Sequence, residues 1–91
     1  MTSALQTRQT LEDAWKNRFH LTATRYRLAA NATRVLLAEQ QSELTPSPDG
    51  SFAYRQALQI ERQLLQEYRR VLGIFTDLVM GRRIPEEDPA G

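Results

Sequence analysis

Apolar residues recur along the first half of the chain at alternating spacings of four and three, the heptad pattern of packed helices. This first seam consists of Trp15, Phe19, Thr22, Tyr26, Ala29, Thr33 and Leu36. The second half repeats the spacing at Ala57, Glu61, Leu64, Tyr68, Val71, Phe75 and Leu78. Each half therefore predicts one long helix, and the two seams are expected to face each other.

Capping and breaking residues set the limits of the first helix. Thr10, followed by two acids, is a typical N-terminal cap, and no proline or glycine follows it until Pro46. Two prolines and an Asp-Gly pair then forbid helix continuation and provide turn chemistry. The sequence predicts a helix over about 11–41 and a turn over 42–50.

The second helix is expected over about 51–80, because Gly81 is a typical stop signal. Together the two helices form one domain over residues 1–84. Residues 85–91 are acidic and proline-rich and lack a large apolar side chain, so we expect a disordered tail there.

These elements predict an all-α fold, a long antiparallel two-helix hairpin. With the turn near Pro46, antiparallel pairing brings Tyr26 close to Tyr68 and Phe19 close to Phe75. The hairpin has one shared seam.

Further apolar residues repeat at spacings of seven outside that seam, and a hairpin alone does not cover them. The economical solution is dimerisation into a four-helix bundle, although a helix of another protein would satisfy the same need. The residues expected at this interface are Leu21, Leu28, Val35, Leu58, Leu65, Leu72, Ile74 and Val79.

Composition changes this picture little. The chain has 12 Lys and Arg against 11 Asp and Glu, a formal charge of +1, so no field of the whole molecule attracts nucleic acid or membrane. The lack of cysteine excludes disulfides and thiolate chemistry, and no signal peptide or membrane span is evident, so we expect a cytoplasmic protein with no membrane partner.

The distribution of charge is more informative, because no acid occurs between Ala14 and Ala38. On a helical wheel, one basic stripe lies opposite the seam and could contact phosphate or an acidic protein surface, or could be an ordinary solvated face. Its members are Lys16, His20, Arg27 and Arg34. Arg18 and Arg25 lie elsewhere on the helix, and Glu61 is their natural partner.

Enzyme and metal chemistry find little support. With one histidine and no cysteine, we expect no metal site, no cofactor and no catalytic residues. Gly73, alone inside the second helix, is interpreted as a point of close helix approach. A remote alternative is a small all-helical enzyme of the chorismate mutase type, which binds a dicarboxylate through arginines, but no motif of that family is matched.

The sequence thus favours a non-catalytic interaction module that acts through apolar helix faces, as an adaptor, a chaperone-like protein or an assembly subunit. Its partner is expected to be a second copy or another helical protein. The alternative is a helical dimer that binds nucleic acid through the basic stripe.

Overall fold

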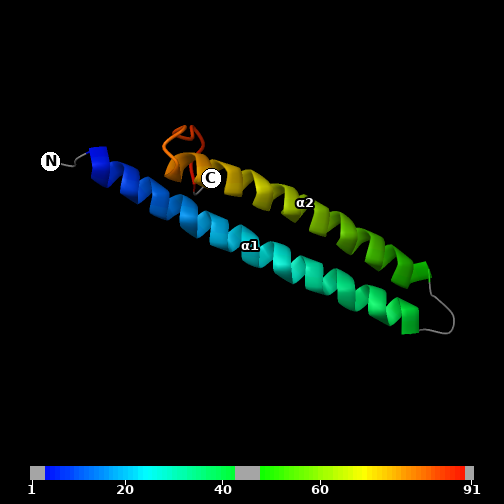
Figure 1. Cartoon of the computed structure of the whole chain (residues 1–91). Helices are drawn as coiled ribbons and strands as arrows, with labels where there is room; N and C mark the ends of the chain where they lie inside the picture. The colour runs from blue at the N-terminus through cyan, green and yellow to red at the C-terminus, as the bar shows by residue number, and fades with distance from the viewer. Residues whose placement is uncertain (1–3, 43–47, 90–91) are drawn as a thin grey trace.

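The computed structural model describes residues 4–42 and 48–89 and contains two helices, α1 (Ala4–Ser42) and α2 (Pro48–Val79). They run antiparallel, side by side, along the whole molecule (Figure 1), whose backbone measures 67 × 20 × 15 Å. No strand occurs in the described ranges. The predicted all-α hairpin is therefore confirmed.

α1 begins at Ala4, seven residues before the expected start at residue 11, so Thr10 lies inside the helix. Arg8 accounts for part of this extension. It pairs with Glu12 one turn later, at 3.4 Å, and its guanidinium donates a hydrogen bond to the carbonyl oxygen of Leu78 in α2, at 3.1 Å. The first turns of α1 thus have a partner in the opposite helix, which a reading of local capping signals does not reveal.

α2 begins at Pro48 rather than at residue 51, because proline is tolerated in the first turn, where its missing N–H would have no helical acceptor. Most of the predicted turn, residues 43–47, lies outside the described residues. At the other end, the N–H of Gly81 bonds to the Leu78 carbonyl at 3.1 Å, and the N–H of Arg82 bonds to the Asp77 carbonyl at 2.9 Å. With a φ of 71° at Gly81, this is a Schellman cap.

The fully buried apolar core is small and lies toward the open end of the hairpin. It consists of Trp15, Val71 and Leu78, with Leu11, Phe19, Ile74 and Phe75 packed against it. The indole N–H of Trp15 has no hydrogen-bond partner among the described residues, an arrangement that costs about 1–3 kcal/mol. A single hairpin therefore has a weak core for its length.

Two threonines occupy buried seam positions without loss of hydrogen bonding. The hydroxyl of Thr22 donates to the Phe19 carbonyl at 2.9 Å, and the hydroxyl of Thr33 donates to the Ala29 carbonyl at 2.9 Å. Because each hydroxyl bonds within its own helix, the seam can close over these side chains.

The aromatic pairs expected across the seam are present. Phe19 stacks on Phe75 with ring centroids 6.0 Å apart, and Tyr26 stacks on Tyr68 at 6.1 Å. Phe19 also contacts Tyr68 at 5.4 Å. These rings fix the register of the two helices, and the predicted pairing is confirmed.

The C-terminal segment has described contacts with both helices, while the disorder expected over residues 85–91 stays a prediction. The structure places residues 80–89 beside the end of α2 and back against α1 (Figure 1), and only the last two residues of the tail lie outside the described part. Arginines hold this segment: Arg70 pairs with Glu87, and Arg18 donates to the carbonyl oxygen of Pro89 at 2.8 Å.

The interpretation of Gly73 as a point of close helix approach is wrong. The residue is exposed, and a Cβ atom built on it would meet no atom within 4 Å. No described helix is long and apolar enough to cross a bilayer.

Candidate interaction surfaces

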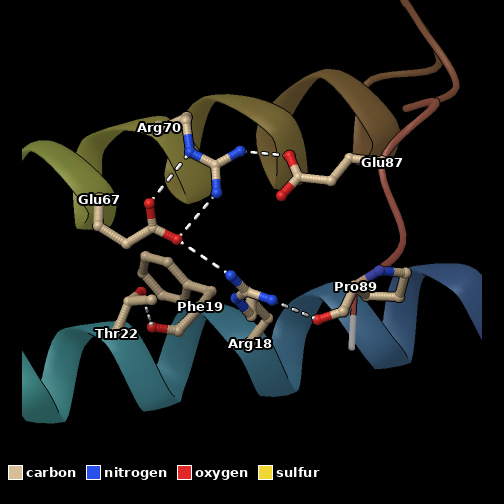
Figure 2. Close-up of polar contacts among 7 residues, drawn as sticks. All are labelled: Arg18, Phe19, Thr22, Glu67, Arg70, Glu87 and Pro89. Carbon is tan, nitrogen blue, oxygen red and sulfur yellow. Dashed lines mark hydrogen bonds and ion pairs between the residues drawn. The ribbon is translucent and has the colours of Figure 1, made fainter. Parts of the chain in front are cut away.

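One side of the hairpin carries a chain of ion pairs, which we call the ion-pair face (Figure 2). Glu67 of α2 accepts from Arg18 of α1 at 3.1 Å and from Arg70 at 2.8 Å, and Arg70 also reaches Glu87. Arg18 completes the arrangement through Pro89. The network therefore joins both helices to the C-terminal segment.

Arginine contacts also set the ionisation of Glu67. The hydrogen bond from Arg70, and to a smaller extent that from Arg18, lowers the pKa of Glu67 below its ordinary value of 4.5, although partial burial acts in the opposite direction. Hydrogen bonds to Glu67 and Glu87 raise the pKa of Arg70. Glu67 and Arg70 are thus both charged at neutral pH.

The expected partner of Arg18 was Glu61, and this prediction is wrong. Phe19 lies opposite Phe75 and Tyr68, so Arg18 reaches the turn of α2 that contains Glu67. Glu61 is nearly two turns farther along and is half-buried without an ion pair among the described residues. The aromatic register decides the pairing.

The opposite side, which we call the aromatic face, is hollowed where rings of both helices meet. A shallow cavity of about 360 Å³ is lined by Phe19, His20, Ala23, Tyr26, Arg27 and Tyr68. The His20 ring lies 5.5 Å from that of Phe19. The rings of the seam are therefore accessible from this side, where the sequence alone placed them inside.

The structure places the two expected apolar lines on different sides of the hairpin. On α1, Leu21 and Leu28 each follow an arginine of the ion-pair side by three residues, and with Val35 they form what we call the α1 shoulder. Its members are exposed by 46%, 66% and 48% for Leu21, Leu28 and Val35.

On α2, Leu65 and Leu72 lie three and four residues from Tyr68, and so beside the cavity on the aromatic face. Leu58 and Val79 extend this line by one heptad at each end; Leu58 and Leu65 are half-buried, and Leu72 and Val79 are more exposed. We call Leu58, Leu65, Leu72 and Val79 the α2 strip.

Ile74 belongs to neither surface. It packs against the buried core and is half-buried, on the side of α2 away from the strip. The eight residues expected at one interface are thus divided among the shoulder, the strip and the core.

The four members of the basic stripe are all exposed on α1. Two of them, His20 and Arg27, line the cavity of the aromatic face together with seam rings, so the stripe lies beside the seam rather than opposite to it as predicted. In the described part of the chain, Lys16, Arg27 and Arg34 make no ion pair, while Arg8, Arg18, Arg70 and Arg82 each have a carboxylate within 4.0 Å.

A second basic row was missed from the sequence. Arg55, Arg62 and Arg69 are exposed on α2, seven residues apart, and each lies next to the α2 strip on its outer side. They too make no ion pair within the described ranges. Their spacing of seven residues could have identified the row from the sequence. It was overlooked because α2 also contains acidic residues, so the helix as a whole is not basic.

No group of three potential metal ligands occurs among residues 4–42 and 48–89. Comparison of the chain with protein-family models, curated proteins and solved structures finds no match. The surfaces themselves carry the functional argument.

Proposed function

We propose that this protein is a non-catalytic interaction module in which two hairpins associate into a four-helix bundle through the α1 shoulder. The observation that carries the proposal is the exposure of Leu28, 66%, at the centre of a regular apolar line. Covering each large side chain of this kind is worth about 1.5–3 kcal/mol.

The α1 shoulder is suited to self-association because its pattern is symmetric. Leu21 and Val35 each lie seven residues from Leu28. A twofold axis at Leu28 would place each Leu28 against its copy and each Leu21 against a Val35 of the other chain, which is the geometry of an isologous interface.

The outer border of the shoulder carries no charge that would oppose such packing. It consists of Asn17, Thr24 and Asn31, all exposed. On the inner border, Arg18 is occupied by Glu67 and Pro89, and Arg25 is exposed with its charged end free to reach water. Two shoulders can therefore approach without burying an unpaired carboxylate.

The test is the solution mass of the wild-type chain and of Leu28→Glu, measured by light scattering over a range of concentrations. We expect a dimer for the wild type and a monomer of unchanged helical content for Leu28→Glu. Gln9→Glu places the same charge at an exposed position of α1 outside the shoulder and its borders and should remain dimeric. A fully dimeric Leu28→Glu variant would show that the shoulder is not the interface.

Nucleic-acid binding is a second candidate. It is supported by Lys16, Arg27 and Arg34, which have no ion pair within residues 4–42 and 48–89, and by the half-exposed rings beside Arg27. Binding to duplex DNA or structured RNA should weaken steeply with salt, and Arg27→Glu/Arg34→Glu should bind less. Absence of any complex at low salt in a mobility-shift titration would remove this candidate.

A further inference from the structure

The aromatic face combines an apolar centre with cations on both edges. The centre consists of the α2 strip and, on α1, of Ala23, Ala30 and Leu37, which are half-buried and seven residues apart. Lys16, Arg27 and Arg34 border it along α1, and Arg55, Arg62 and Arg69 border it along α2. This arrangement spans both helices.

The six bordering cations are available to a partner. All six are exposed, and none has an ion pair within the described residues. Acids near the two rows are few: Glu61 is half-buried beside the α2 strip, Asp13 is exposed three residues before Lys16, and Glu12 pairs with Arg8. At the end of the α2 row, Arg69 lines a cavity together with Glu86 and Glu87. Cations therefore predominate along both edges, most clearly at Arg27 and Arg34 on α1 and at Arg55 and Arg62 on α2.

We propose that the aromatic face binds an amphipathic helix of another protein whose apolar stripe is flanked by acidic residues. The proposal rests on the proposed function as an interaction module, and it assigns to the second side of the hairpin a partner class different from a second copy. Such a helix is apolar in the middle and acidic on both sides, which is the pattern complementary to the aromatic face.

The dimensions of the hairpin suit a third helix. A helix with its side chains is about 10–12 Å across and packs about 8–10 Å from its neighbours, so it can lie in the groove between two parallel axes. A helix in this groove would have the α1 row on one side and the α2 row on the other. Acidic flanks would then reach both rows at once.

Charge argues against other occupants of the same face. A second copy would bring its own two basic rows against these two, so like charges would meet in a partly desolvated contact. A nucleic-acid backbone would satisfy the arginines but would gain nothing from the leucines of the α2 strip, which would stay hydrated or be covered by phosphate. An acidic amphipathic helix uses both features.

The experiment measures binding of the full-length chain to a labelled synthetic peptide of about three heptads, with leucine at the a and d positions and glutamate at e and g. The matched peptide carries lysine in place of glutamate. We expect saturable binding of the acidic peptide by fluorescence anisotropy, weakening as salt rises, and no binding of the lysine peptide.

Two variants locate the contact. Arg34→Glu/Arg62→Glu changes one cation in each row and should raise the dissociation constant about tenfold or more. Arg25→Glu/Arg83→Glu makes the same change in charge at exposed positions outside the rows and should bind as the wild type does. Circular dichroism verifies that both variants keep their helices.

Other results would overturn the proposal. These are failure of the acidic peptide to bind at low salt, equal loss of affinity in both double variants, or preference for single-stranded nucleic acid or for vesicles of phosphatidylglycerol and phosphatidylcholine over the peptide. Leu28→Glu separates the two proposals, because it should abolish the dimer and leave peptide binding intact.

Discussion

Two glycines near the end of α2 have opposite conformational requirements, although both are exposed. Gly73 lies in regular helix with open space around its Cα atom. We expect Gly73→Ala to raise the free energy of unfolding by about 1 kcal/mol, because alanine loses less backbone entropy in a helix. Urea denaturation followed by circular dichroism measures this change.

Gly81→Ala is the matched comparison and should destabilise the fold by about 1–2 kcal/mol, because its φ of 71° is unfavourable for a residue with a Cβ. The added Cβ would also lie 2.9 Å from a terminal guanidinium nitrogen of Arg8. If Gly73→Ala lowered the free energy of unfolding as much as Gly81→Ala does, Gly73 would have to make a close contact that the single hairpin does not contain.

At the scale of the elements, the Glu67 network makes the contact between α1 and α2 sensitive to acid. Its carboxylate has a pKa below the ordinary value of 4.5, so its contribution to stability is present above that value and is lost as the pH falls through the lowered pKa. We expect the melting temperature to fall with acidification, and to fall less in Glu67→Gln.

Thermal unfolding at a series of pH values between about 6 and 2 tests this expectation. Asp13→Asn removes an exposed acid that has no ion pair among the described residues, and it should keep the wild-type slope. Equal pH profiles for Glu67→Gln and the wild type would contradict a stabilising role for the pairs with Arg18 and Arg70.

The two helices and their register could be predicted from the sequence because heptad spacing and aromatic position are local signals that agree with the packing. The pairing of Tyr26 with Tyr68 needed only the place of the turn. The start of α1 could not be predicted in this way, since Arg8 finds its partner at Leu78, 70 residues later.

The candidate surfaces were predicted less well for a related physical reason. Periodicity identifies Leu28 and Leu65 as lying outside the seam, but it does not tell on which side of the hairpin each lies. That depends on how the second helix is rotated against the first. Here Arg18 and Glu67 meet on one side of the seam, and Arg27 and Tyr68 line a cavity on the other. The contact of the acidic segment with Arg70 through Glu87 could likewise not be predicted, because it forms only when the segment lies against the folded helix.

At the scale of the whole molecule, the proposed dimer predicts that stability depends on protein concentration. The melting temperature of the wild-type chain should rise as the concentration increases, because association favours the folded state by mass action. Leu28→Glu should melt at one temperature throughout. A wild-type melting temperature that does not change over a hundredfold range of concentration would contradict dimer-linked folding.

The position of the core has a consequence for local opening. Trp15, Val71 and Leu78 are buried near the open end, whereas toward the turn the seam holds partly exposed residues such as Leu36 and Ala57. Regions with few buried apolar contacts open most readily, so amide protons near the turn should exchange with solvent faster than those around Trp15. Protection in this hairpin should therefore be greatest at the open end around Trp15 and should decrease toward Leu36 and Ala57.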